Sequence, residues 1–206
     1  GLSMSILIGV LAAGVSAVMA LILGICAATL GKKVDSAISF AIDTVMGIPH
    51  ILLLILISYA MGKGLKGVIA GVALTHWTSL ARLIRGEVMQ LRESEYIQIA
   101  GKLGLGKWEI AKKHIVPHVL PQFIVGLVLL FPHAILHESS ITFLGFGLST
   151  EQPAIGVILS ESMRYLIMGK WWLAVFPGMM LVLTVVLFEK GGTALRQLLD
   201  PGSVHK

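Results

Sequence analysis

The sequence predicts an all-α membrane protein, a bundle of helices that crosses the bilayer several times. Two observations support this fold class. The 206 residues are 56% hydrophobic and only 13% charged, a composition far more apolar than that of soluble domains. The apolar residues also form long runs, close to the ~20 residues that a membrane-spanning helix requires. We expect five such spans in a single transmembrane domain, residues 1–206.

The first run extends from Ser3 to Leu30 without a charge. Ala20, Gly24 and Ala28 recur at intervals of four within it. Small residues at this spacing let helix backbones approach closely, so one face of this helix is expected to pack on another helix. A chance distribution in a helix rich in alanine and glycine is the alternative.

The second run, Ser36 to Gly62, is interrupted by Asp43. A carboxylate inside a membrane helix costs about 3 kcal/mol unless it is paired or hydrated, so we expect Asp43 to face the bundle interior. Pro49 lacks the amide that would continue the helix and predicts a kink or break. This break is either a bend that lines a pore and moves, or a structural interruption satisfied by its neighbours.

The third run, Gly67 to Ala81, is short for a span, but basic residues at both ends can extend toward the interface. Gly67 and Gly71 form a GxxxG pattern, which is weak evidence for close helix packing. We expect the chain to leave the membrane at Arg82.

A charged insert, Glu95 to Pro121, follows with a helix–glycine–helix pattern interrupted at Gly104. Basic residues outnumber acidic ones over residues 82–113, so the positive-inside rule predicts a cytoplasmic loop, which we bound at residues 86–116. The remaining basic residues fit this topology. Lys32, Lys33, Lys190, Arg196 and Lys206 fall on the same side, and Lys63, Lys66, Arg164 and Lys170 fall on the other.

The fourth run starts at Pro117 and Pro121, with proline at the helix start, where no hydrogen bond is lost. Residues 139–170 are too interrupted by glycine, proline and charge to span, so short helices at the outer surface are expected. Trp171 to Phe188 is the last span, with tryptophan at the outer interface.

Several function classes are disfavoured. Residues 101–107 have the glycine and lysine spacing of a phosphate-binding loop, but Trp108 replaces the Ser or Thr that binds magnesium, and no strand precedes the motif. We therefore expect no ATP site and no cofactor in this chain. No nucleophile–base–acid set is evident, so the chain is not predicted to be an enzyme. The net charge of +5 is attributed to membrane topology, not to nucleic-acid binding.

Histidines raise the question of a metal. His133 and His137 lie four apart beside Glu138, and imidazoles at that spacing can share Ni²⁺ or Zn²⁺. Pro132 disturbs the local helix and no third ligand is visible, so hydrogen-bonded packing histidines are the default expectation. His50 and His76 also lie in or near spans.

Two blocks carry a family resemblance. Gln98-Ile99-Ala100, Gly104 and Pro117, flanked by Glu95 and Trp108, resemble the cytoplasmic EAA loop of permease subunits in binding-protein-dependent ABC importers. The block from His137 to Gly147 resembles the peptide and nickel branch, as in the dipeptide and oligopeptide permease C subunits. Further matches are Trp171-Trp172, Phe176-Pro177-Gly178 and Leu199-Asp200-Pro201.

This resemblance implies the type I ABC importer permease fold, with one further N-terminal span missing from the chain, in a prokaryotic inner membrane. The implied partners are a homologous second permease, two cytoplasmic ATPases, an extracytoplasmic substrate-binding protein and the lipid bilayer. The implied cargo is a peptide, nickel or another metal chelate.

The resemblance also implies roles for residues. Glu95, Gln98, Ala100, Gly104, Trp108 and Pro117 would couple the permease to the ATPases. Gln98 and Ala100 would lie at the docking surface, and Trp108 would wedge the second loop helix against the membrane helices. Asp43, Pro49 and Glu138 are candidates for lining the translocation path.

A transporter or channel driven by an ion gradient is the alternative function. Asp43 and Glu138 would then be ion-coupling groups. The lack of an evident inverted repeat weighs against it.

Overall fold

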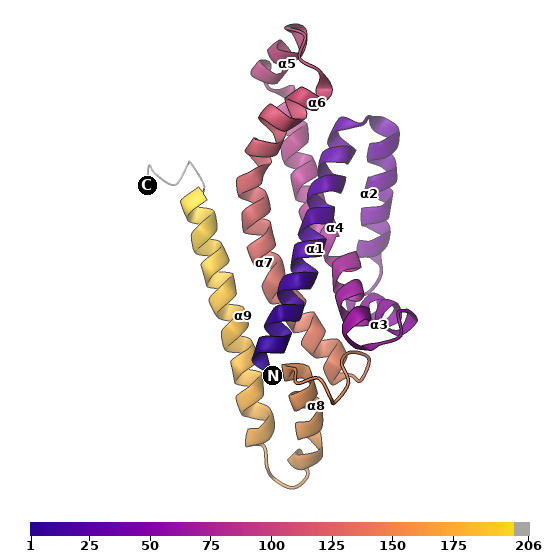
Figure 1. Cartoon of the computed structure of the whole chain (residues 1–206), viewed down its shortest axis with the longest axis vertical. Coiled ribbons are helices and arrows are strands. Elements are labelled where there is room, and N and C mark those ends of the chain that lie inside the picture. The colour runs from indigo at the N-terminus through magenta and orange to yellow at the C-terminus, as the bar shows by residue number, and fades with distance from the viewer. Residues whose placement is uncertain (200–206) are drawn as a thin grey trace.

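The structure is a computed structural model, and it describes residues 1–199 as a bundle of long helices (Figure 1). The predicted match at Asp200-Pro201 and the basic Lys206 lie outside the described residues. Secondary structure over the described range is helical, which confirms the predicted fold class.

Within residues 1–199, four helical stretches are long and apolar enough to cross a membrane. They are α1 (Leu2–Thr29), α4 (Gly64–Glu93), the stretch Trp108–Phe143 that contains α7 (Val116–Phe143), and α9 (Trp172–Leu199). A fifth span is present if α2 (Lys32–Gly47) and α3 (His50–Ala60) are counted together. These two helices meet at an angle of 100°, so the break predicted at Pro49 is confirmed.

The small residues of α1 lie against α4 at the centre of the bundle. Ala20, Gly24 and Ala28 are all buried. A Cβ added at Gly24 would lie only 2.8 Å from the carbonyl oxygen of Ala81, a distance that real Cβ contacts avoid. The predicted close-packing face is therefore confirmed.

The GxxxG pattern brings α4 close to α3. A Cβ on Gly67 would lie 2.6 Å from the carbonyl oxygen of Ser58, and one on Gly71 would lie 3.3 Å from that of Leu54. The Ser58 hydroxyl donates a hydrogen bond to the carbonyl of Phe146 at 2.8 Å. This bond ties the end of α3 to the loop after α7.

Helix boundaries differ from expectation in three places. The apolar run ends at Ala81, but the helix continues through Arg82 to Glu93, because charged side chains end the apolar run without breaking the backbone hydrogen bonds. The outer segment 139–170 begins inside α7, which ends at Phe143, and it contains one separate helix, α8 (Ile155–Leu166).

The third difference is at the start of the fourth span. The helical backbone does not begin at Pro117 but runs through α6 (Lys107–Ile110) and the π-helical turn η1 (Ala111–Ile115) into α7. A π turn is wider than an α turn, and this one ends at Ile115, with only Val116 between it and Pro117, so it accommodates the proline ring and its missing amide.

The two ends of the bundle carry different elements. α5 (Glu95–Lys102) and α6 lie at the same end as the α1–α2 turn, whereas α3 and α8 lie at the opposite end (Figure 1). Arg92 donates a hydrogen bond to the carbonyl of Ala28, which holds the end of α4 against the end of α1. Among the described residues, the elements that carry the predicted cytoplasmic basic residues reach this same end, as the positive-inside rule requires.

Candidate functional site

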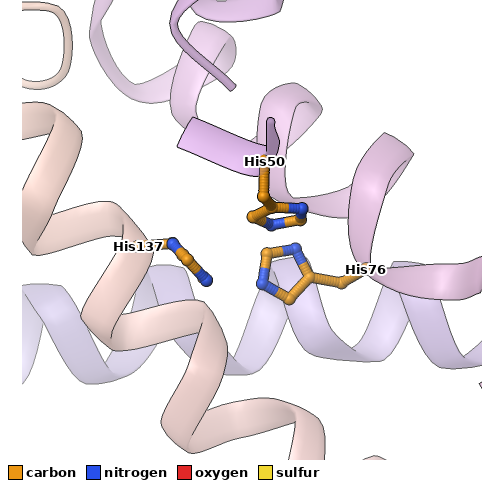
Figure 2. Close-up of side chains that lie close together, drawn as sticks. All are labelled: His50, His76 and His137. Atoms are coloured by element: carbon orange, nitrogen blue, oxygen red, sulfur yellow. The ribbon is translucent and has the colours of Figure 1, made fainter. Parts of the chain in front are cut away.

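Three histidines from three helices meet where the second span is broken. His50 is the first residue of α3, His76 lies in the middle of α4, and His137 lies in α7. Their rings point toward one another (Figure 2), with centroids 4.5–5.0 Å apart. One ring nitrogen from each lies within 4.8 Å of the others.

The histidine cluster, defined as His50, His76 and His137, lies in the wall of a cavity of about 550 Å³. The end of α2 and the break contribute one side of this cavity, and α4 and α7 contribute the others. Its other polar side chains are Thr75, Thr78, Ser79 and His133. The cavity is large enough for a small hydrated solute.

Hydrogen bonds fix the ring of His76. Its Nδ1 lies 3.0 Å from the carbonyl oxygen of Val72 and 3.0 Å from the hydroxyl of Thr75. The Thr75 hydroxyl donates its own proton to the carbonyl of Gly71 at 2.9 Å. A carbonyl only accepts, so Nδ1 carries the proton and Nε2 presents a lone pair.

Two nitrogens of the cluster are buried without a hydrogen-bond partner in the described residues: Nε2 of His50 and Nε2 of His76. A buried polar atom left unpaired costs roughly 1–3 kcal/mol. The cluster is therefore a place where the fold leaves hydrogen-bonding capacity unused.

The candidate pair of His133 and His137 is not the group whose nitrogens converge in the structure. His133 lines the cavity, but the group whose ligand atoms converge joins His137 to His50 and His76 instead of His133. The sequence placed His50 and His76 near spans but not near each other, because only the packing of α3 on α4 and α7 unites them. Pro132 does not interrupt α7, which continues past it.

Of the predicted path residues, Pro49 lies in the cavity wall beside His50. Asp43 does not face the interior of this chain, since its side chain is 67% exposed. Its carboxylate instead accepts a hydrogen bond from Arg82 of α4 at 2.5 Å. The ion pair with Arg82 offsets part of the free-energy cost of a carboxylate in a membrane segment, so this chain need not bury Asp43 inside its own bundle.

A second ion pair lies in the first turn of α2. Asp35 accepts hydrogen bonds from both the Nε and the Nη2 groups of Arg85. Both side chains are about three-quarters buried. The two pairs join α2 to α4 along the half of the bundle that leads to the loop helices.

Glu138 is fully buried and is absent from the cavity wall. It accepts hydrogen bonds from the hydroxyls of Ser139 at 3.2 Å and Thr142 at 3.1 Å, and from the hydroxyl of Ser5. The Ser5 oxygen also accepts the amide of Ile155 at 3.1 Å. Glu138 therefore joins α1, α7 and α8 through this network of hydroxyl groups.

The loop helices meet at a tight bend centred on Gly104. Its φ is +92°, in the left-handed region that L side chains rarely adopt. The amide of Gly104 donates to the carbonyl of Gly101 at 3.2 Å, and the amide of Leu105 donates to that of Ala100 at 3.2 Å. These two bonds form a Schellman motif that ends α5, so the predicted helix–glycine–helix turn is confirmed.

The side chains of the loop face differently from the expectation. Ala100 is buried with Ile97 on the inner face of α5, so it does not lie at a docking surface. Trp108 does not wedge against the membrane helices, since its side chain is 81% exposed. Glu95 and Gln98 are exposed, and Pro117 follows the π turn at the base of the loop.

The loop also exposes large apolar side chains among its charged ones. Ile99, Leu103 and Trp108 are 53%, 76% and 81% exposed, and we call them the apolar loop face. Large hydrophobic side chains exposed at the end of a bundle are typical of an interaction surface.

Comparisons with known proteins agree with this geometry. The dipeptide transport system permease protein DppC of Bacillus subtilis (strain 168) is 32% identical over 201 residues, which cover 98% of this chain and 63% of that protein. The oligopeptide transport system permease protein OppC of the same organism is 31% identical over 201 residues, with 98% of this chain and 66% of that protein covered. The chain thus spans about two thirds of the length of these relatives.

Solved structures share the fold. A chain from inward-facing conformations of the MetNI methionine ABC transporter superposes with a TM-score of 0.77 at 16% identity, covering 97% of this chain and 94% of that chain. A chain of an amino acid ABC transporter crystallised with histidines gives a TM-score of 0.69 at 18% identity, covering 96% and 91%. Residues 20–203 match one family profile, and the chain belongs to that family, the binding-protein-dependent transport system inner membrane components.

Proposed function

We propose that this chain is one permease half of a binding-protein-dependent ABC importer of the peptide branch. The observation that carries the proposal is the bent loop at the end of the bundle, with its apolar face open to a partner. The curated relatives are named as dipeptide and oligopeptide permeases, which supports peptides as the cargo.

The loop and the cavity are joined by one helix. α4 has 30 residues and therefore spans about 45 Å. It ends at Glu93, one residue before α5, and carries His76 in its middle. If a docked ATPase displaces the loop, α4 would transmit the displacement to the cavity wall, because its backbone is one continuous hydrogen-bonded helix. Such a link would provide the two-state coupling that ATP-driven transport requires.

The proposed partners follow from the surfaces. Two cytoplasmic ATPases dock on the apolar loop face of this chain and on its counterpart in a homologous second permease. Phe40 on α2 is 74% exposed, beside the exposed pair of Asp43 with Arg82, so this side of the bundle suits a protein partner or an aqueous path. An extracytoplasmic binding protein delivers cargo at the end that carries α3 and α8. ATP hydrolysis belongs to the partner ATPases.

Membership of this family favours the importer over a transporter or channel driven by an ion gradient. The burial of Glu138 in a hydroxyl network also removes one of the two groups that such coupling would use. Asp43 and Pro49 remain the residues that we propose for the translocation path.

Nickel or another metal chelate is a second cargo that we propose. The observation that favours it is the histidine cluster in the cavity wall. Peptides are themselves metal chelators through their amine and amide nitrogens, so the two cargo classes are chemically compatible.

The experiment is reconstitution in liposomes with the cognate permease, ATPases and binding protein. Uptake and ATP hydrolysis should both require the complete assembly and cargo-loaded binding protein. Gly104→Trp should insert normally but lose the stimulation of ATP hydrolysis by loaded binding protein, because its φ is strained. Transport by this chain alone without ATP would refute the importer, and unchanged stimulation in the variant would refute the coupling role.

A further inference from the structure

We infer that His50, His76 and His137 form a binding site for a divalent transition metal such as Ni²⁺ or Zn²⁺, in the wall of the cavity at the break between α2 and α3. Imidazole nitrogen is a preferred ligand of these ions. The site deepens the proposed function by naming a cargo class, and only the metal's status as cargo rests on that function.

The distances suit a site that closes on its metal. If the three nitrogens formed a triangle with sides of 4.8 Å, each would lie about 2.8 Å from the centre. Zinc–imidazole bonds are about 2.0–2.1 Å long, so each nitrogen must move inward by roughly 0.7 Å. His50 and His137 are only half-buried and have room for this rotation.

The hydrogen bonds of His76 prepare it as a ligand. Its Nδ1 proton is directed to the carbonyl of Val72, which leaves the Nε2 lone pair free. Metal-binding histidines characteristically donate their other ring proton to a carbonyl or carboxylate, which fixes the ring orientation. His76 makes this second interaction, so its ring is already oriented for a ligand role.

Simple helix packing explains the cluster less well. Packed neutral imidazoles satisfy their nitrogens by bonding to each other or to neighbours, whereas the Nε2 atoms of His50 and His76 are buried and, among the described residues, unpaired. A metal ion would satisfy both atoms together with the nitrogen of His137. The same three residues come from α3, α4 and α7, so the ion would also join the three helices.

Three protein nitrogens leave coordination positions open. A tetrahedral ion would keep one further position and an octahedral ion three. The cavity provides the space for water or for the donor atoms of a small chelator. The shared chemistry is therefore an accessible divalent ion, arriving either hydrated or held by a small chelator.

The test uses the purified full chain in detergent, with any polyhistidine tag removed. Equilibrium dialysis against NiCl₂, and separately ZnCl₂, followed by elemental analysis should find about one ion per chain. His50→Ala, His76→Ala and His137→Ala should each weaken binding more than about tenfold. His133→Ala is the matched control, since it lines the same cavity outside the cluster, and it should bind as the wild type does.

A spectroscopic measurement keeps the test independent of folding defects. Co²⁺ bound to the unaltered protein should show visible d–d bands typical of nitrogen ligation. The half-buried His50 can be replaced by Asn with little risk to packing, and the bands should then shift. Equal metal binding by wild type and the three cluster variants, or loss of binding only in the His133 variant, would overturn the inference.

Dialysis with Ni²⁺ in the presence of excess free histidine distinguishes the two sources. Retention of nickel together with histidine indicates a chelated ion, and retention of nickel alone indicates a hydrated one; both support the site. The metal-binding assay and the Gly104→Trp assay of ATP hydrolysis are independent. A negative result in the first would refute the metal site and leave the importer function untouched.

Discussion

Gly104→Ala should loosen the bend of the cytoplasmic loop through backbone strain alone. The φ of this residue is +92°, and a Cβ added there would meet no atom within 4 Å. Steric clash with neighbours therefore contributes nothing. An L residue in a left-handed conformation costs about 1–2 kcal/mol, which corresponds to a factor of about 5–30 in the population of the bent state.

Hydrogen exchange measures this population directly. The amides of Gly104 and Leu105 are held by the Schellman bonds to Gly101 and Ala100, so they are protected only while the bend persists. Mass-spectrometric exchange on the purified chain should show these amides exchanging about 5–30-fold faster in Gly104→Ala. The measurement requires neither ATPase nor cargo.

Gly106→Ala is the matched control. Gly106 lies two residues away, a Cβ added there would also meet no atom within 4 Å, and its φ is not positive. Its exchange should stay within error of the wild type. If both variants exchange equally fast, or if neither differs from the wild type, the left-handed bend is not what holds the loop.

Two further predictions concern helix packing, and both are read from thermal unfolding in detergent. Arg85→Ala and Asp35→Ala should each lower the free energy of unfolding by about 1–3 kcal/mol, because each breaks a largely buried bidentate pair. The double variant should lose less stability than the sum of the two single losses. Strict additivity would show that the two residues are not coupled. Gly67→Leu should cost about 1–3 kcal/mol, because its Cβ would lie 2.6 Å from the carbonyl of Ser58. A Cβ added at Gly86 would meet no atom within 4 Å, so Gly86→Leu is the control and should be near neutral. Equal losses of stability in the two leucine variants would contradict the close approach of α3 and α4.

Composition and run length were sufficient to predict the spans because lipid leaves the backbone no partner except its own helix. Pro49 predicted the break for the same reason, since one missing amide interrupts that continuity. The apolar run did not predict the end of α4, because Arg82 marks only where the apolar sequence ends, and a helix continues beyond that point as long as its backbone hydrogen bonds do.

The faces of the loop helices were harder to predict. The family motif predicted that Gln98 and Ala100 lie at the docking surface, but Ala100 lies with Ile97 on the buried face of α5. Helical spacing from Ala100 would place Leu103 on the buried face, but Leu103 is the C-cap of α5 and is 76% exposed. A large apolar side chain that is exposed next to a buried stripe is typical of an interaction surface.

The histidine cluster could not be derived from local spacing. His50, His76 and His137 lie on three different helices, and only the tertiary packing of α3, α4 and α7 brings their rings together. One feature of the sequence does indicate a position near a cavity: His50 directly follows Pro49, which breaks a span. Helices in membranes are interrupted only where the unpaired backbone groups line a cavity or are buried in protein.

The break between α2 and α3 also limits what mutagenesis can reveal. Val45, Met46 and Gly47 end α2 and line the cavity, and the carbonyl groups of a last helical turn have no amide ahead of them to bond. These oxygens are main-chain atoms, so replacing any side chain leaves them in place. An alanine scan would therefore not detect the contribution of these carbonyl groups to solute binding. Only a change to the main chain itself, such as an ester linkage or a shifted helix break, would reveal it.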